Sequence, residues 1–397
     1  MKAYNYDMLV IGAGPSGSTA ARFAAKKGLK VLLIEKRPDI GSPVRCGEGI
    51  SKAWLSEVEI KPSKTWLSNE VLGARIFSPD ERTHVELSAD KAGNEVGYII
   101  ERDKFDKYLA ALAGEAGAEI WVKSPALELL KENDKVVGAI VRKFGEKVEV
   151  RAKIVIGADG FESQVGRWAG INTMLKENDI ESCIEYRMVG IDINEKFTDF
   201  YLGSAAPGGY VWVFPKSKKE ANVGIGIALN KIKDKGEVKK YLDNFIAAHE
   251  NLKKGTAIEI ITGAVSISQV PKSLVSDNVM LVGDSARLID PITGGGIANA
   301  CISGKYAAGV AYDAIKANNT SKEYLAKYNT LIKDKFEKRN LRNWFAKEKL
   351  SELSDETLNK LVDAISSVNI ESISVRSLLN AVQQKYPELI KEFEDLL

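Results

Sequence analysis

Two glycine-rich loops, far apart in the chain, constrain its fold more than any other feature. The first, Gly12-Ala13-Gly14-Pro15-Ser16-Gly17, directly follows the apolar run Met8–Ile11. The second begins with Gly283-Asp284 after the apolar run Val279–Val282 and leads into a Pro-Ile-Thr-Gly-Gly-Gly segment. Each apolar run is typical of a buried strand, and each loop precedes a segment that can form a helix. This order predicts an α/β fold that binds one dinucleotide through two separate loops.

The first loop has the arrangement of a dinucleotide-binding βαβ unit. Gly12 permits a tight turn, Gly14 lets the backbone approach a pyrophosphate, and Gly17 lets the helix pack closely on the strand. The helix N-terminus offers unpaired N–H groups to the phosphates. A second strand, Val31–Ile34, ends in Glu35, whose carboxylate can accept both ribose hydroxyls and disfavours the 2′-phosphate of NADP. The predicted ligands in this unit are Gly12, Gly14, Pro15, Ser16, Gly17 and Glu35.

The second loop indicates which dinucleotide binds. In an FAD-binding fold of this type, an aspartate after a late strand holds the ribityl chain, a role that Asp284 would fill. Capping a helix N-terminus is the alternative for Asp284. Gly295, Gly296 and Ile297 would bring backbone N–H groups close to the flavin ring, where they can stabilise negative charge. With both loops on one molecule, FAD is the predicted cofactor.

Composition excludes several other classes of protein. The 397 residues include 56 Lys and Arg against 54 Asp and Glu, so that the net charge of +2 argues against a nucleic-acid binder. Three cysteines and two histidines make a disulfide framework, a metal centre and a serine–histidine triad improbable. No apolar run reaches the roughly 20 residues of a membrane span, and the N-terminus lacks a signal-peptide pattern. We therefore expect a cytoplasmic protein, with contact to a membrane surface left open.

Three motifs resemble those of the FAD-dependent superfamily that includes para-hydroxybenzoate hydroxylase and the geranylgeranyl reductases. They are the Gly12 to Gly17 loop, Asp159-Gly160, and Gly283-Asp284 with Pro291, and the resemblance covers about residues 5 to 315. It implies that Arg102 opens a helix and reaches the flavin side, where a surface helix arginine is the alternative. It also implies that the backbone of Ala126 binds adenine.

Two further stretches resemble the geranylgeranyl reductases in particular. Arg45-Cys46-Gly47-Glu48-Gly49 is similar to their loop beside the flavin. The implied cofactor contacts there are Arg45, Cys46, Gly47 and Gly49. Tyr210-Val211-Trp212-Val213-Phe214-Pro215 matches their Tyr-x-Trp-x-Phe-Pro pattern. On a strand, Tyr210, Trp212 and Phe214 share one face, and the resemblance implies that they bind substrate. The alternative is an aromatic face packed in the core of a sheet.

The resemblance implies FAD-dependent saturation of geranylgeranyl double bonds, in particular those of archaeal-type glycerophospholipids. Cys46 is the candidate catalytic proton donor, or else a small residue that lines the pocket, and a redox pair with Cys301 is a further alternative. Because the chain has no second Gly-x-Gly-x-x-Gly loop, electrons would come from a visiting NAD(P)H or from a ferredoxin-like protein. The competing functions are an aromatic monooxygenase and an electron-transfer flavoprotein.

The motifs also suggest how the chain divides into domains. Residues 1–70, 97–177 and 269–320 would form a discontinuous, Rossmann-like FAD-binding domain, and residues 71–96 and 178–268 an inserted antiparallel-sheet substrate domain. Residues 321–397 would form a C-terminal helical region. Within it, Leu331–Leu350 carries seven Lys or Arg against three Asp or Glu, a net charge of +4. Its apolar side would pack on the protein core or dock on an anionic bilayer.

Overall fold

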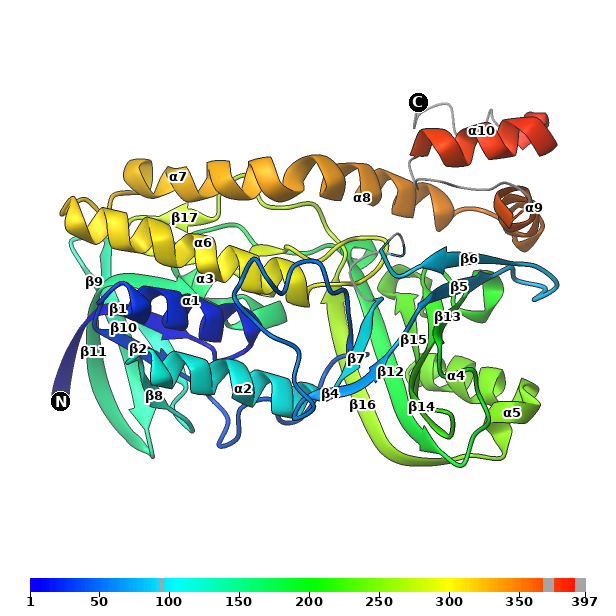
Figure 1. Ribbon diagram of the computed structural model, residues 1–397. Coiled ribbons are helices and arrows are strands. Elements are labelled where there is room, and N and C mark those ends of the chain that lie inside the picture. The colour runs from blue at the N-terminus through cyan, green and yellow to red at the C-terminus, as the bar shows by residue number, and fades with distance from the viewer. Residues whose placement is uncertain (91, 93–95, 367–374, 390–397) are drawn as a thin grey trace.

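Two large sheets lie side by side in the computed structural model, with helices α7 and α8 running along one edge of both (Figure 1). The structure describes residues 1–90, 92, 96–366 and 375–389. One sheet has eight strands and the other has seven, and a small three-stranded sheet lies between them. This arrangement confirms the predicted fold class.

The eight-stranded sheet is built around the parallel strands that the glycine loops predicted. Its main order is β17-β18-β11-β1-β2-β8, parallel except for the pairing of β17 with β18. The antiparallel strands β9 and β10 extend from β11. The bounds are β1 Lys2–Ile11, β2 Val31–Ile34, β8 Glu119–Trp121, β9 Ala126–Glu132, β10 Lys135–Lys143, β11 Glu146–Gly157, β17 Val275–Ser276 and β18 Val279–Leu281.

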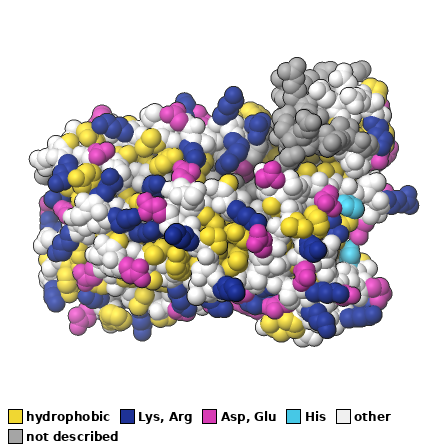
Figure 2. Space-filling view, in the orientation of Figure 1, with side chains coloured by type: hydrophobic (Ala, Val, Ile, Leu, Met, Phe, Trp, Pro, Cys, Tyr) yellow, Lys and Arg dark blue, Asp and Glu magenta, His cyan; other side chains and the backbone are white. Residues whose placement is uncertain are grey.

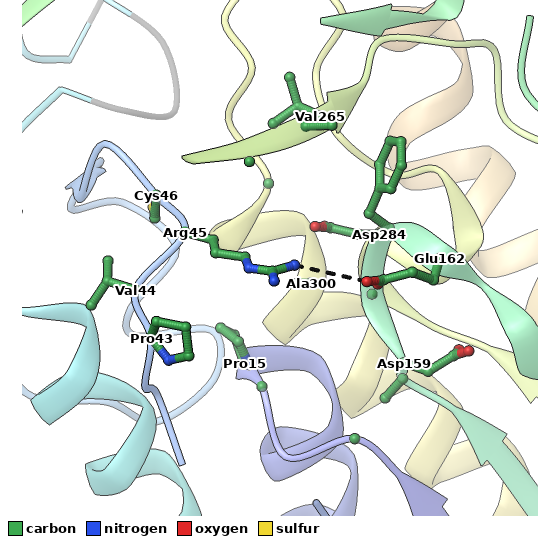
Figure 3. Close-up of a pocket in the computed structure, with 18 of the residues that line it drawn as sticks. Pro15, Pro43, Val44, Arg45, Cys46, Asp159, Glu162, Val265, Asp284 and Ala300 are labelled. Atoms are coloured by element: carbon green, nitrogen blue, oxygen red, sulfur yellow. Dashed lines mark ion pairs between the residues drawn. The ribbon is translucent and has the colours of Figure 1, made fainter. Parts of the chain in front are cut away.

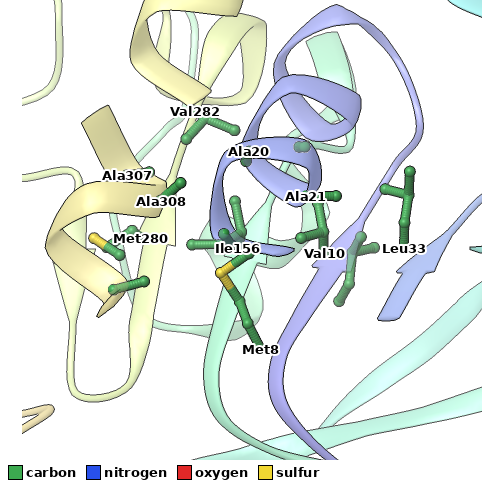
Figure 4. Packing of buried hydrophobic residues seen from close by; sticks show 14 of the residues in the cluster. Met8, Val10, Ala20, Ala21, Leu33, Ile156, Met280, Val282, Ala307 and Ala308 are labelled. Carbon is green, nitrogen blue, oxygen red and sulfur yellow. The ribbon is translucent and has the colours of Figure 1, made fainter. Parts of the chain in front are cut away.

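Helices of small residues cover this sheet. Helix α1 (Pro15–Lys26) has proline at its first position, which suits a residue without an N–H donor. Helix α6 (Ile297–Lys316) packs so closely on α1 that a Cβ at Gly304 would lie 2.3 Å from the carbonyl oxygen of Ser16. Figure 4 shows alanines of α1 and α6 against Met8, Ile156 and other strand residues. Helix α2 (Arg102–Glu115) packs on the other side of α1, and the short helix α3 spans Gln164–Trp168.

The seven-stranded sheet has the order β16-β12-β15-β14-β13-β5-β6 and is antiparallel except where β13 pairs with β5. Its bounds are β5 Gly73–Phe77, β6 His84–Ser88, β12 Ile180–Val189, β13 Phe197–Tyr201, β14 Tyr210–Ser217, β15 Glu220–Ala228 and β16 Thr256–Ser266. Helices α4 (Glu237–Ala248) and α5 (Glu250–Lys253) cover one face, where Val211 and Val213 are buried. Trp212 and Phe214 point to the opposite face, as the period of two predicts.

The three-stranded sheet joins the two halves, with β7 (Tyr98–Ile100) between β3 (Gly49–Ile50) and β4 (Leu67–Glu70). All three of its strands fall in segments predicted for the FAD-binding domain. The exact domain boundaries proposed from the sequence stay a prediction.

The C-terminal region is helical, as expected, over the residues that the structure describes. Helix α7 (Lys322–Ile332) continues through a π-helical turn (Lys333–Glu337) into α8 (Lys338–Leu350), so that one long rod results (Figure 1). Helices α9 (Asp355–Ser366) and α10 (Val375–Lys385) follow. Residues 367–374 and 390–397 of the predicted helical region lie outside the described residues. Among those described, no helix is both long and apolar enough to cross a membrane.

The apolar residues predicted for one side of Leu331–Leu350 mostly face outward. Leu331, Leu341 and Phe345 are 40%, 41% and 50% exposed. Ile332 and Phe336 are the residues that pack into the core instead. The segment therefore packs on the protein core through Ile332 and Phe336, and the three other side chains stay partly exposed; docking on a bilayer stays a prediction.

Candidate cofactor and substrate cavity

A cavity of about 890 Å³ opens at the carboxyl ends of the parallel strands and extends to the seven-stranded sheet. The loops after β1, β2, β11 and β18 all reach it, and Figure 3 shows their residues converging on one space. In α/β sheets, this edge is where ligands bind. The predicted cofactor residues that line it are Gly12, Gly14, Pro15, Ser16, Glu35, Arg45, Cys46, Gly47, Arg102, Ala126, Asp284, Gly296 and Ile297.

Three predicted cofactor residues do not line the cavity. A Cβ at Gly17 would lie 1.9 Å from the carbonyl oxygen of Gly12, which confirms that this glycine allows the helix to approach the strand. Gly49 pairs with Ile99 at the start of β3. The carbonyl of Gly295 accepts the N–H of Asp290 at 3.0 Å. These three glycines therefore belong to the backbone that surrounds the cavity and do not line it.

The part of the cavity beside the Gly12–Gly17 loop and Glu35 fits the adenosine diphosphate half of FAD. Glu35 points its carboxylate to the loop, where it accepts the N–H of Ala13 at 3.1 Å and that of Arg37 at 3.0 Å. A Cβ at Gly14 would meet no atom within 4 Å, so that the cavity comes directly up to this backbone. Space beside the N-terminus of α1 is where the dipole and free N–H groups favour a pyrophosphate.

Two aspartates face the cavity from the neighbouring strand ends. Asp284 lies in a short 3₁₀ turn (Gly283–Ala286) whose N-cap is Val282, and it caps no helix. The capping alternative is therefore wrong. Burial raises the pKa of Asp284, although Arg102 and Arg287 oppose this. Asp159 accepts the N–H of Val165 at 3.0 Å through Oδ2, while its buried Oδ1 has no partner. Both aspartates line the same cavity as the Gly12–Ser16 loop, and a carboxylate there can accept a hydroxyl of a dinucleotide such as FAD.

The loop that carries Cys46 forms another wall. The Sγ atom of Cys46 accepts the N–H of Glu48 at 3.2 Å. Burial raises the pKa of the Cys46 thiol, and Arg102 only partly opposes this, so the group is a protonated thiol at neutral pH. The Arg102 guanidinium is held by two 2.9 Å hydrogen bonds to Asp106. Arg45 extends to Glu162, 3.8 Å away, from the opposite side of the cavity (Figure 3).

A buried ion cluster behind this loop was missed by the sequence analysis. Glu48 accepts Lys216 Nζ at 2.6 Å, Asn222 Nδ2 at 2.7 Å and the backbone N–H of Arg102 at 2.6 Å. Lys216 also lies 3.0 Å from Glu101. The cluster therefore ties the Cys46 loop to β14 and β15 of the other sheet. The sequence did offer one signal for this cluster: Lys216 is a charged residue at an inward position of an otherwise apolar strand.

The predicted substrate residues pack beside the cavity and do not line it. Trp212 donates its indole N–H to Glu185 at 2.6 Å, and Tyr210 donates its hydroxyl to the carbonyl of Thr293. A Cβ at Gly47 would come within 3.1 Å of Phe214 and 3.2 Å of Trp212. The aromatic side chains thus support the wall that Gly47 forms. Direct contact between them and a substrate stays a prediction.

Within the predicted substrate domain, the sequence analysis did not single out the residues that line the cavity on the side of the seven-stranded sheet. Cys183 and its neighbours on β12, with Thr262–Val265 on β16, line this wall. Cys183 pairs with glycine on both adjacent strands, Gly226 and Gly263, so that no bulky side chain flanks it.

The third cysteine, Cys301, is fully buried under α1, and burial raises its pKa to about 12. All three cysteines are free, and a Cys46–Cys301 redox pair remains an untested prediction. Among the described residues, no group of His, Cys, Asp or Glu could hold a metal ion.

Comparisons with known proteins agree with this geometry. A family model described as geranylgeranyl reductase catalytic domain matches residues 179–265, which include β12, β14 and β15. A model described as NAD(P)-binding Rossmann-like domain matches residues 10–48. Among solved structures, a geranylgeranyl bacteriochlorophyll reductase-like protein from Thermoplasma acidophilum is 58% identical with a TM-score of 0.94, and all of both chains is covered. The myxobacterial halogenase CndH, at 18% identity and a TM-score of 0.69, shares the fold.

Curated relatives match along the whole chain. The digeranylgeranylglycerophospholipid reductase of Picrophilus torridus is 61% identical over 394 residues, or 99% of both chains. The protein of that name from Methanocella arvoryzae is 45% identical over 393 residues, again 99% of both. Identity of this extent confirms the resemblance drawn from the motifs: the chain belongs to the digeranylgeranylglycerophospholipid reductase family.

Proposed function

We propose that the protein is an FAD-dependent reductase that saturates the double bonds of geranylgeranyl chains in an archaeal-type glycerophospholipid. One observation carries the proposal. The same cavity is lined by the dinucleotide loop at Gly12–Ser16 and by strands β12 and β16 of the segment that matches the reductase catalytic domain. Cofactor and lipid chain would therefore meet in one cavity, as hydride transfer requires.

The residues around the cavity have separable tasks in this proposal. FAD, when bound, supplies the hydride. The Gly12–Ser16 backbone holds its pyrophosphate, Glu35 its adenosine ribose and Asp284 its ribityl chain, while Arg102 and the backbone of Gly296 and Ile297 lie on the flavin side. The electrons arrive from a visiting NAD(P)H or a ferredoxin-like protein.

Reduction of an isolated alkene also needs a proton, because no carbonyl polarises the double bond. Cys46 lines the cavity and keeps its thiol proton at neutral pH, so it is the candidate donor. Cys46→Ser keeps the size of the side chain and replaces the thiol. We expect a single-turnover reaction slower by about 100-fold or more, the typical loss for a general acid. An unchanged rate would leave Cys46 as a residue of the cavity wall only.

Helix α8 supports contact with the membrane that holds such a lipid. Leu341 and Phe345 are exposed on it among basic side chains, and Figure 2 shows Lys and Arg along the edge where α7 and α8 lie. Apolar residues within a basic helix favour an anionic bilayer. We therefore propose peripheral docking on the cytoplasmic face. Leu341→Ser with Phe345→Ser should reduce co-sedimentation with anionic vesicles, and unchanged binding would contradict this docking face.

The activity is tested by reducing the FAD-loaded protein without oxygen and adding a geranylgeranyl glycerophospholipid. The flavin absorbance of the oxidised state should return, and mass spectrometry should show a lipid heavier by two hydrogens per reduced bond. An aromatic monooxygenase would need O₂, and an electron-transfer flavoprotein would leave the lipid unchanged. Either result would contradict the proposal.

A further inference from the structure

A second cavity, of about 300 Å³, lies where the segments before β12 and after β16 meet helix α8. Its wall includes Thr173 and Lys176 from one segment, Ser268 from the other, and Trp344 from α8. Arg287, from the loop after β18, also lines it. None of these residues takes part in the cofactor cavity.

Two hydrogen-bonding groups in this wall are buried without a partner. Thr173 is 2% exposed, and its hydroxyl makes no hydrogen bond, nor does the indole N–H of Trp344. A buried polar group left unpaired is destabilising, because it has lost its hydrogen bonds to water. Both groups can donate a hydrogen bond, which indicates that the cavity suits an acceptor ligand.

The charges around the cavity favour an anion. Arg287 is 3% exposed, and its guanidinium donates to the carbonyls of Thr173, at 2.7 and 3.2 Å, and Phe161, at 2.7 Å. It forms no ion pair with any residue that the structure describes. Burial lowers the pKa of Arg287, although Asp284, Asp159 and Glu162, which lie outside the wall of this cavity, oppose this.

Lys176 adds a second positive charge, and Asp179 is the one carboxylate among the residues that line the cavity. The Oδ2 atom of Asp179 is already occupied by the backbone N–H of Lys176 at 3.2 Å. Two cations and two free donors thus face one carboxylate, and the balance in the cavity is positive.

We propose that this cavity binds a phosphate group, and that the phosphate is the headgroup of the lipid substrate. A tetrahedral oxyanion accepts donors from several directions, as Thr173, Trp344 and Lys176 would supply them. The assignment to a lipid rests on the proposed function. The phosphate site itself stands on the unpaired donors and charges alone.

The position of the cavity suits a headgroup. Strand β16 lines the cofactor cavity up to Val265, and Ser268 in the second cavity follows three residues later, about 10 Å of extended chain. A lipid held here by its phosphate could therefore send a prenyl chain to the flavin side. Phe345, exposed next to Trp344, places the same site at the face proposed to touch the membrane.

The first experiment measures phosphate binding without reference to activity. The FAD-loaded, full-length protein is titrated with inorganic phosphate by calorimetry, so that the pyrophosphate site is already filled. Thr173→Val removes one donor while keeping the shape of the side chain, and Trp344→Phe removes the other donor while keeping an aromatic, though smaller, ring. We expect about 10- to 100-fold weaker binding for each, the loss of one hydrogen bond to a charged group. Thr256→Val, an exposed control on β16, should bind as the parent does.

The second experiment separates the two sources of phosphate. A raised KM for a geranylgeranyl glycerophospholipid, with an unchanged KM for the same lipid lacking phosphate, would assign the site to the headgroup. Weaker binding of inorganic phosphate with both KM values unchanged would overturn the headgroup assignment and leave a site for free phosphate. No saturable phosphate binding, or equal binding by parent and both variants, would overturn the site. An inactive protein that binds phosphate as expected would contradict the proposed function and not the site.

Discussion

Lys216 is at the centre of the buried ion cluster, and replacing it by methionine tests our account of the cavity wall. Its side chain is 1% exposed, with Nζ 2.6 Å from Glu48 and 3.0 Å from Glu101. Methionine fills similar space without a charge. Glu48 would then keep only neutral donors, the backbone N–H of Arg102 and the amide of Asn222. Removing one partner of a buried ion pair costs about 3–5 kcal/mol, and we expect Lys216→Met to lower the free energy of unfolding by this amount.

The matched variant Glu48→Gln should cost less. Lys216 would retain Glu101 and the carbonyl of Ile100, and the new amide oxygen could still accept a hydrogen bond. The expected loss is about 1–3 kcal/mol. In the double variant neither buried charge remains unpaired, so its loss should be at least 1 kcal/mol smaller than the sum of the single losses, roughly the coupling of residues in contact.

Urea unfolding at pH 7, followed by far-ultraviolet circular dichroism on FAD-loaded protein, measures all three free energies. The order of the losses is the critical result, since it follows from which group is left without a countercharge. A loss below about 1 kcal/mol for Lys216→Met, or strictly additive losses, would refute the reasoning.

Two other substitutions, with one control on α6, test the seven-stranded sheet. Burial raises the pKa of Glu181 to about 7 from 4.5, against the effect of Lys347. The native state therefore keeps a proton that the unfolded chain releases, and stability falls between about pH 4.5 and 7 by roughly 3 kcal/mol. In urea unfolding, Glu181→Gln should be more stable than the parent at pH 8, and a difference that is the same at pH 4.5 would contradict this. A Cβ at Gly224 would lie 2.3 Å from the Trp212 ring, so Gly224→Ala should cost about 1–3 kcal/mol, whereas Gly309→Ala, in open space on α6, should raise the free energy of unfolding by about 0.5–1 kcal/mol, both measured by thermal unfolding. Equal stability of these two variants would contradict the packing of the Trp212 ring on Gly224.

The parallel sheet could be predicted because its signals are local. A strand, a glycine loop and a helix are consecutive in the sequence, and strands β1, β11 and β18 then lie next to one another. Their carboxyl ends share one edge, so the loops that carry Gly12, Asp159 and Asp284 meet there. Local patterns and one topological rule were enough for the cofactor half of the site.

The rest of the site depends on contacts that no local pattern records. Glu48 and Lys216 are far apart in sequence, and only the packing of the two sheets brings them together. For the apolar residues of Leu331–Leu350 the sequence left two orientations open, packing on the core or facing outward. Only the tertiary packing decides between them: Ile332 and Phe336 are buried, whereas Leu341 and Phe345 stay exposed.

The two glycines of the first loop separate folding from cofactor binding. A Cβ at Gly12 would lie 2.2 Å from the carbonyl oxygen of Ala158, and its φ of +107° disfavours any other residue, so Gly12→Ala should disrupt the sheet edge itself. Gly14 has an ordinary φ of −74°, and a Cβ there meets no atom of the protein. Gly14→Ala should therefore fold with parental stability in the FAD-free form but lose FAD, because the added methyl group occupies the space where the pyrophosphate approaches the backbone. Circular dichroism with a flavin titration distinguishes the two effects, and full FAD affinity in Gly14→Ala would mean that the phosphates lie elsewhere.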